Sequence, residues 1–210
     1  MVLDLQQEIV IVTVIGVESF PCSMRGQKKI MIDGKWQIGS LQLPWKLPMT
    51  WLEEQLTELV TGDLSNVTFK VADLINPDEP DQIVKVMIDC GKCPVVERDT
   101  LQKALIAAHD ETPAALATIV KSMGSTLHKA GARMLIYRDG QTHGTFGSFS
   151  VESEIRLEAL KVIDEERSCN HIVSLSADNV ALEGMACDGM LEIFVEPVNT
   201  FMQALKHSDK

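Results

Sequence analysis

The sequence has few aromatic residues and few basic ones. Its 210 residues include 3 Trp, 1 Tyr and 6 Phe, and 19 Lys and Arg stand against 30 Asp and Glu, a formal charge of −11. This acidic balance disfavours nucleic-acid binding, which depends on clusters of cations. A hydrophobic content of 45% is nevertheless enough for a folded core, so a largely disordered chain is excluded.

Membrane, secretion and disulfide signals are also missing. The longest apolar stretch, Ile9–Val17, is far shorter than the roughly 20 residues of a membrane-spanning helix. The first eight residues, Met1–Glu8, are acidic where a secretory signal is basic. The five cysteines are odd in number and irregularly spaced, which argues against a disulfide framework. We therefore expect a cytoplasmic protein with reduced thiols, and neither a membrane nor a nucleic acid as its partner.

One pattern occurs twice in the chain. In the first half the apolar run Ile9–Ile15 precedes Gly26–Gly34, and in the second half Leu116–Val120 precedes Gly131–Gly140. Both glycine-bounded segments contain Asp-Gly between apolar runs, which favours a tight hairpin because glycine tolerates positive φ. The order and spacing of these blocks nearly coincide, so the sequence predicts a diverged tandem duplication.

Each copy predicts a strand, a hairpin, a helix, two strands and a short helix. The fold class is therefore α+β, with two similar mixed-sheet/helix units packed with pseudo-two-fold symmetry. One continuous sheet is the alternative architecture. The polar segment His109–Pro113 marks the boundary, which divides the chain into copies 1–110 and 114–207.

The long helices have recognisable ends in the sequence. The first is expected to begin near Trp51, with Thr50 and Glu53 as a capping box, and to end at Gly62. The second is expected from Val151, with Ser150 as its N-cap. The later strands are expected at Ile83–Ile88, Ile172–Leu175 and Leu191–Val195.

Three blocks of the second copy occur in an order typical of one family. They are Ala117–Thr126 with Gly131–Leu135, the glycine-rich Gly144–Glu152, and Ala186–Glu192. Through these blocks, residues 114–198 resemble the amino-terminal domain of the XdhC/CoxI family, the accessory proteins of molybdenum hydroxylases such as xanthine dehydrogenase. The first copy looks like a diverged relative of the same domain.

The resemblance implies a chaperone for a molybdenum hydroxylase. Such a protein binds the molybdenum pyranopterin cofactor, helps its sulfuration and delivers it to the apoenzyme. It is not expected to turn over a substrate, so the chain is not expected to be an enzyme. The partners implied are a hydroxylase subunit and a cysteine desulfurase, and a homodimer stays open.

The phosphate of a pyranopterin requires cations and free backbone amides in its site. Both hairpin regions, Ser23–Gln37 and Lys121–His143, contain four cations against one acid, a local balance of +3. Two such hairpins could focus an anion, or their charges could be solvated outer faces. The cofactor-binding residues predicted from the resemblance and the local charge are Gly124, Ser125, Thr126, Lys129, Arg133, Gly147, Ser150, Glu152, Cys187, Asp188 and Gly189.

Cys187 is the candidate metal ligand. A thiolate is a soft ligand for molybdenum or a carrier of sulfur, although a single cysteine also serves as a small buried hydrophobe. Ser150 stands where the family usually has a second cysteine, and a hydroxyl is a harder ligand. The altered Ser148–Ser150 turn keeps open a degenerate scaffold that retains the fold without a ligand.

Cys90 and Cys93 form the only Cys-x-x-Cys pair of the sequence. With Cys187 they allow a different function, that of a thiol-based sulfur carrier. Such pairs work best at a helix N-terminus, whereas Pro94–Val96 is expected to be extended. A zinc site would need two more ligands, and no second pair occurs at a suitable spacing.

Two other groups of side chains are interpreted as lining or core. The methionines near the proposed site either line an adaptable pocket or fill a core; they are Met123, Met134, Met185 and Met190. The tryptophans Trp36, Trp45 and Trp51 all lie in the first copy. They form either a partner-docking surface or the cover of a core.

Overall fold

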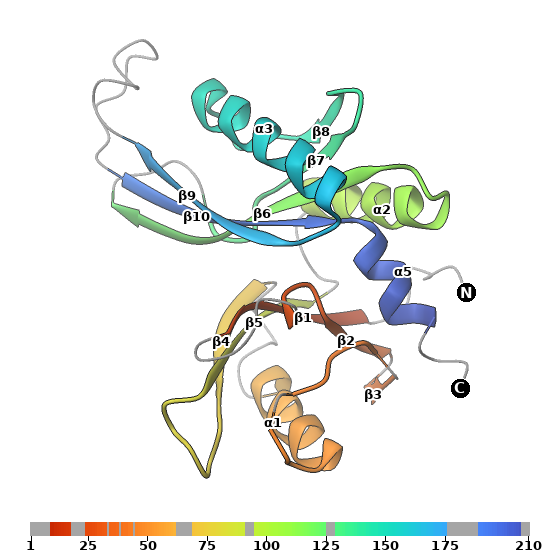
Figure 1. The fold of residues 1–210 in the computed structure, drawn as a ribbon, viewed down its shortest axis with the longest axis vertical. Helices are drawn as coiled ribbons and strands as arrows, with labels where there is room; N and C mark the ends of the chain where they lie inside the picture. The colour runs from red at the N-terminus through yellow and green to blue at the C-terminus, as the bar shows by residue number, and fades with distance from the viewer. Residues whose placement is uncertain are drawn as a thin grey trace. The chain divides into compact units, whose positions relative to one another are not determined.

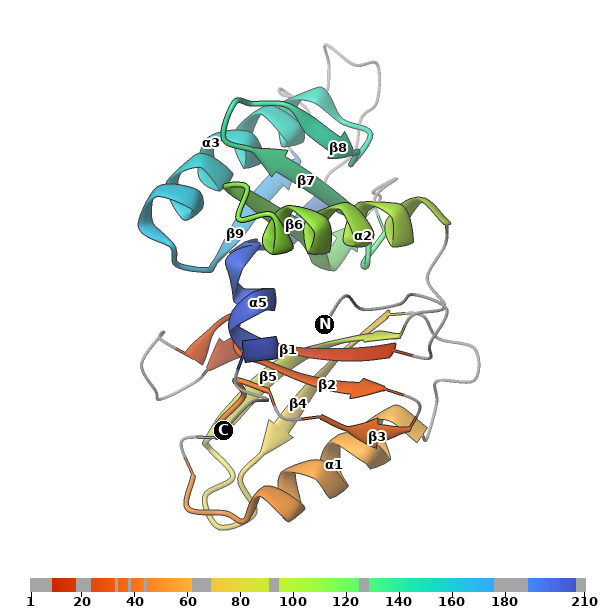
Figure 2. The same ribbon diagram turned by 90° about the vertical axis from the view of Figure 1, so that its right-hand side faces the viewer.

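The structure, a computed structural model, describes residues 9–17, 24–32, 34–37, 39–43, 45–61, 69–90, 95–124, 129–175 and 189–206. In this part of the chain, ten strands form two five-stranded antiparallel sheets, accompanied by four helices (Figures 1 and 2). The α+β fold class is thus confirmed. No helix among these residues is long and apolar enough to cross a membrane.

Contacts divide the chain into two compact units. Unit 1 comprises Met1–Pro94 and Thr200–Lys210, and unit 2 comprises Val95–Asn199. The pseudo-two-fold packing expected for the copies stays a prediction, as does their division at residues 110 and 114.

Unit 1 contains one sheet, in the order β3-β2-β1-β5-β4. Its elements are β1 (Ile9–Val17), β2 (Lys28–Ile32), β3 (Lys35–Trp36), α1 (Met49–Thr61), β4 (Phe69–Ile75), β5 (Ile83–Cys90) and α5 (Asn199–Lys206), the last from Thr200 on. The central strand β1 is rich in β-branched residues, which suit a strand buried on both faces. Its alternate residues Val10, Val12 and Val14 pack against α1 through Leu52 and Leu56.

The predicted capping box of α1 is wrong. The helix begins at Met49, so Thr50 is already its second residue. Glu53 forms an ion pair with Lys29 at 2.8 Å instead. The predicted end at Gly62 lies outside the described residues.

The three tryptophans cover the unit 1 core. Trp45 is buried, and its ring meets that of Trp51 edge to face with the centroids 5.8 Å apart. Trp36 is half-buried, stands beside α1 and packs against the same core. The interpretation of the tryptophans as core cover therefore holds for all three.

Unit 2 repeats the same strand order, β8-β7-β6-β10-β9. Its elements are α2 (Val95–His109), β6 (Ala114–Gly124), β7 (Arg133–Tyr137), β8 (Thr142–Gly144), α3 (Phe149–Glu165), β9 (Cys169–Leu175) and β10 (Gly189–Pro197). The strands β5, β9 and β10 contain the segments predicted as strands, which confirms those predictions. The hairpin predicted at Asp139-Gly140 is confirmed too, with Gly140 at φ +84° between β7 and β8.

The long helix of unit 2 covers one face of its sheet (Figure 1). Its buried residues recur at helical spacing and form one stripe: Val151, Ile155, Ala159, Val162 and Ile163. The helix ends at Glu165, and the following residue, Glu166, adopts the left-handed conformation common after a last turn.

Strand pairing also matches between the units. Thr13 is paired with Lys28 in unit 1, and Thr118 is paired with Arg133 in unit 2. The identical strand orders and these similar pairs are consistent with two similar units. The tandem duplication itself stays a prediction.

The last helix of each copy packs on the sheet of the other copy. Helix α2 follows β5 in the chain, yet it contacts β6, β7 and β8 of unit 2. Helix α5 follows β10, yet from Thr200 on it belongs to unit 1. Each sheet is therefore completed by a helix that does not follow it in the sequence.

Candidate functional site

The residues of the predicted site lie at two levels of the unit 2 sheet. Gly189, which begins β10, is paired with Gly124, which ends β6. Gly144, which ends β8, is paired with Met134 near the start of β7. Met134 is in turn paired with Ala117, seven residues before Gly124 on β6, so the end of β8 lies well back from the tips of β6 and β10. Figure 1 shows the first turn of α3 on the same side of the unit as the tips of β6, β9 and β10.

A glycine turn between β8 and α3 is held by one carboxylate. Glu152 Oε1 accepts hydrogen bonds from the backbone amides of Phe146 (2.8 Å) and Gly147 (3.1 Å). It also accepts one from the Thr145 hydroxyl, which itself accepts from the Gly147 amide at 2.9 Å. Such bonds to an ionised group are stronger than neutral ones. The turn amides therefore already bind an anion supplied by the chain.

Gly144 allows a close backbone approach at the start of this turn. Its φ is +82°, and a Cβ at this position would lie 2.5 Å from the Arg133 carbonyl oxygen and 2.9 Å from Thr100 Oγ1. A Cβ at Gly39 of unit 1 would clash in the same way with the Lys28 carbonyl oxygen. Both positions thus require glycine on steric grounds.

The N-cap prediction for Ser150 is wrong. The helix begins at Phe149, and Ser148 occupies the N-cap position with extended backbone angles. Ser150 lies inside the first turn, with its Oγ 3.1 Å from Ser148 Oγ. Two nearby serines can each serve as a cap, and the sequence alone did not distinguish them.

Three exposed large apolar side chains of unit 2 lie on α3, β6 and β10. Phe149, the first residue of α3, is 78% exposed. Met123 and Met190 are paired across β6 and β10, and both are exposed. The sequence identified the two methionines as possible lining, but it treated Phe149 only as a departure from the family pattern. Exposed apolar groups of this size can serve as contact points for a partner.

Three cations of the basic hairpins differ from both sequence interpretations, whereas Lys35, Lys121 and Arg138 are exposed as the solvated-face interpretation expects. Lys28 is fully buried; its Nζ donates to Thr13 Oγ1 at 3.2 Å and lies 4.3 Å from the centre of the Phe201 ring. Lys29 and Arg133 are buried as well. The interpretation of these three cations as a solvated face is wrong, and their burial also removes them from an anion-focusing surface. Lys129 is exposed at the turn before β7.

Several predicted residues cannot be placed. Ser125, Thr126, Cys187 and Asp188 lie outside the described residues, so the metal and cofactor roles assigned to them stay predictions. Among the described residues, no group of three or more His, Cys, Asp or Glu side chains is placed to hold a metal ion.

The Cys-x-x-Cys segment lies between a strand and a helix. Cys90 is the last residue of β5, and α2 begins at Val95. The expectation that Pro94–Val96 is extended is therefore wrong for its last two residues. Cys93 lies outside the described residues, and the sulfur-carrier alternative stays a prediction.

A polar network that the sequence did not reveal joins α3 to β9. The Cys169 thiol donates to Glu158 Oε1 at 3.6 Å, and His171 Nε2 lies 2.6 Å from Glu154 Oε1. The hydrogen bond from Lys161 to Glu158 (2.9 Å) lowers the pKa of that carboxyl, against a smaller opposing effect of burial. The contacts of Glu158 with Cys169 and of Glu154 with His171 join distant segments, so no local motif signals them.

Comparison with known proteins agrees with the resemblance in unit 2. Residues 107–175 match the model of the XdhC and CoxI family. The match covers about a third of the chain and includes the glycine turn with Glu152, which confirms the resemblance over that segment.

Similarity to curated proteins and to solved structures is weaker than the family match. No curated protein matches the chain. Among solved structures, the crystal structure of a xanthine dehydrogenase from Bacillus halodurans is similar, at 27% identity and a TM-score of 0.42. The similar region covers 50% of this chain and 32% of that protein, so the chain spans about a third of its length.

Proposed function

We propose that this chain is an accessory protein of a molybdenum hydroxylase, because residues 107–175 match the XdhC and CoxI family. The role is to bind the apoenzyme and its molybdenum pyranopterin cofactor during maturation, without turnover of a substrate. The matched segment contains the glycine turn whose amides donate to the Glu152 carboxylate, the most specific local geometry of unit 2. The proposal is supported by the fact that the family match and this geometry fall on the same segment.

The glycine turn does not fit the phosphate of the cofactor. Its amides at Phe146 and Gly147 already donate to Glu152, and that carboxylate would repel a second anion. Arg133 is 3% exposed and does not offer its charge to a ligand at the surface. We therefore infer that Gly147 and Glu152 shape the turn for a protein contact.

We propose cofactor contact at the tips of β6 and β10 instead. Gly124 and Gly189 stand opposite each other there, next in the chain to Ser125 and to Cys187–Asp188. The test is to purify the full chain from cells that make the cofactor, and to measure molybdenum and pterin fluorescence. A stoichiometric signal that Cys187→Ala abolishes supports the proposal, and a wild-type protein without molybdenum or pterin refutes it.

The apoenzyme contact is proposed at Phe149, the exposed aromatic residue that begins α3. Phe149 presents most of its ring to solvent beside a rigidly held turn, and exposed aromatic groups of this kind contribute strongly to binding when a partner covers them. Two helical turns further on, Leu157 is 66% exposed and provides a matched control on the same helix.

The binding test uses the full chain and a cofactor-free xanthine dehydrogenase. We expect Phe149→Ser to raise the dissociation constant by about tenfold or more, and Leu157→Ser to change it by less than about twofold. Absence of a complex with the wild-type chain would refute the apoenzyme contact. Equal losses in the two variants would refute its location at Phe149.

A further inference from the structure

The outer strands of the two sheets differ in how they are protected against pairing with another chain. In the part of the chain that the structure describes, these strands are β3 and β4 in unit 1 and β8 and β9 in unit 2. An outer strand presents N–H and C=O groups that can pair with a further strand. Proteins therefore usually shorten, charge or cover such strands.

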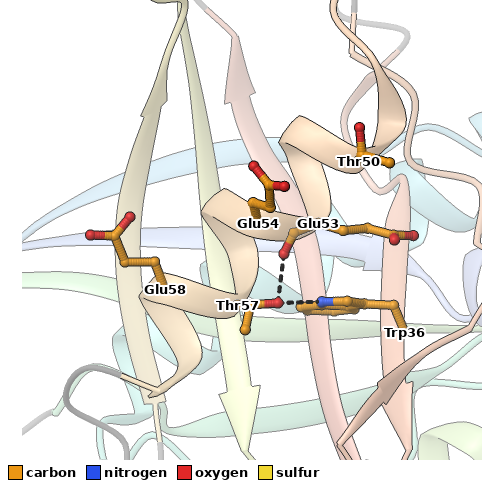
Figure 3. A pocket seen from close by; sticks show the side chains of 6 residues that line it. All are labelled: Trp36, Thr50, Glu53, Glu54, Thr57 and Glu58. Atoms are coloured by element: carbon orange, nitrogen blue, oxygen red, sulfur yellow. Dashed lines mark hydrogen bonds between the residues drawn. The ribbon is translucent and has the colours of Figure 1, made fainter.

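Three of these four outer strands are protected. Strand β3 has only two residues, and its Trp36 is joined to α1 by a hydrogen bond from Nε1 to Thr57 Oγ1 at 2.8 Å (Figure 3). Strand β8 has only three residues. Strand β4 is longer, but it contains two ionisable side chains, Lys70 and Asp73. Short length and charge both oppose the addition of another strand.

Strand β9 has none of these features. It is seven residues long and contains no Lys, Arg, Asp, Glu or Pro. Its register with β10 has no bulge from Cys169 to Leu175. Among the described residues, β10 is the one strand that pairs with it. Within that part of the chain, the outer backbone groups of the middle of β9 are therefore accessible to a further strand.

An exposed apolar patch adjoins this edge. Alternate residues of β9 belong to the core covered by α3, so Ile172 faces the other side of the sheet, where it is 59% exposed. Met190 of β10, which is paired with Ser174, and Met123 of β6, which is paired with Met190, are exposed on the same face. Apolar side chains that adjoin one another at the surface are typical of a contact with another protein.

The side chains of β9 match those of a second, antiparallel copy of the same strand. In a register centred on Ile172, the opposed pairs are Ile172 with Ile172, Asn170 with Ser174, Cys169 with Leu175, and His171 with Val173. The first three pairs oppose like side chains, and no pair opposes two charges, which is the favourable arrangement across neighbouring strands. This register places both copies of α3 on one face. Because α3 lies mainly over β6 and β10, it leaves room beside β9 for the second copy.

We propose that two copies of this chain form a dimer through β9, in the antiparallel register centred on Ile172. The two five-stranded sheets of unit 2 then become one continuous sheet, and the two-fold symmetry closes the assembly at the dimer. A contact through one strand belongs to the small interfaces below about 1,200 Å², so we expect a weak dimer with a dissociation constant of about 10 µM. The proposal does not depend on the accessory function proposed above.

The test is sedimentation velocity of the full chain from about 1 µM to about 300 µM, a range that brackets the expected dissociation constant. The two copies each have a net charge of −11 and repel each other. The dimer should therefore strengthen as ionic strength rises from about 0.01 M to about 0.15 M, because the Debye length falls from about 30 Å to about 8 Å. A chain that stays monomeric at the higher ionic strength would overturn the proposal and would leave β9 to a strand of another protein. Assembly beyond a dimer would also overturn it.

A pair of matched variants locates the contact. Ile172→Lys places two like charges directly opposite each other in the dimer, so we expect the dissociation constant to rise by about tenfold or more. The control is Ile106→Lys, the same substitution at a 52%-exposed position of α2, which should leave the dissociation constant within about twofold. Equal effects of the two variants would overturn the location at β9. Circular dichroism spectra verify that both variants fold.

Hydrogen exchange of the wild-type chain locates the contact without a substitution. Amides of β9 should become more protected when the concentration rises from about 1 µM to about 300 µM, whereas those of the outer strand β4 should not change. A dimer that forms without added protection in β9 would overturn the proposal.

Discussion

Gly144 is the residue on which the geometry of the glycine turn most depends. Its positive φ disfavours any other residue, and the Arg133 carbonyl leaves no room for a side chain. Gly140 has a similar φ of +84°, but a Cβ there would meet nothing within 4 Å. Alanine substitutions at these two glycines therefore distinguish the cost of an unfavourable positive φ, which both share, from the cost of a steric clash, which occurs only at Gly144.

We predict that Gly144→Ala lowers the free energy of unfolding by about 3 kcal/mol. Gly140→Ala, which suffers only the unfavourable conformation, should cost about 1 kcal/mol. Urea denaturation of the full chain measures both. Equal costs for the two variants would contradict the close approach at Gly144.

At the residue scale, the sequence predicted features that depend on near neighbours. The hairpin glycines were predicted because Asp-Gly between apolar runs is a local signal. The burial of Lys28 and Arg133 was not predicted, because charged residues are ordinarily exposed. Their burial depends on partners from other strands and helices, such as Thr13 and Phe201 for Lys28.

Among the elements, an ion pair within α3 makes stability depend on pH. The ammonium of Lys161 keeps the pKa of Glu158 below its ordinary value of 4.5. A carboxyl with a lowered folded-state pKa stabilises the protein above the unfolded-state value, and this contribution is lost as the pH falls through the lower folded-state value.

We predict that Glu158→Gln lowers the free energy of unfolding at neutral pH by at most about 1 kcal/mol, because Lys161 is solvent-exposed and screened. The difference from wild type should shrink below pH 4.5 as the carboxyl of the wild type becomes protonated. Denaturant unfolding over a pH series measures this. If the difference in unfolding free energy between wild type and Glu158→Gln grew on acidification, the lowered pKa of Glu158 would be contradicted.

At the element scale, hydrophobic periodicity correctly predicted the order of strands and helices. The first residue of each long helix was not predicted, because candidate caps lie within two residues of each other. Glu53 shows the reason. The capping box is a local pattern, whereas the pair that Glu53 forms with Lys29 joins α1 to β2.

In the whole molecule, the last helix of each sequence copy belongs to the unit of the other copy, an arrangement that we call the helix exchange. The sequence repeat assigns α2 to the first copy and α5 to the second, whereas the contacts assign α2 to unit 2 and α5 to unit 1. Repeats in a sequence show which elements are alike, but they contain no signal for the sheet on which a terminal helix packs.

The exchange predicts which sheet each helix stabilises. Phe201 of α5 packs over Lys28 of β2, and Leu101 is the buried residue of α2 at the matching place. Phe201→Ala should destabilise unit 1 by about 3 kcal/mol, and Leu101→Ala should destabilise unit 2 by a similar amount.

Native-state hydrogen exchange measures the destabilisation of unit 1 and that of unit 2 separately. Phe201→Ala should reduce the protection of amides in β1 and β2, and Leu101→Ala should reduce it in β6 and β7. A loss of protection in β9 and β10 on Phe201→Ala, without a loss in β1 and β2, would contradict the exchange.

The accessory role is tested most directly by the molybdenum content of a hydroxylase made with and without this chain. The hydroxylase is purified from cells that synthesise the cofactor, and molybdenum is measured per hydroxylase subunit. Our account predicts that co-production of the full chain raises the content toward one molybdenum per active site, together with activity. The same molybdenum content in both preparations would contradict it.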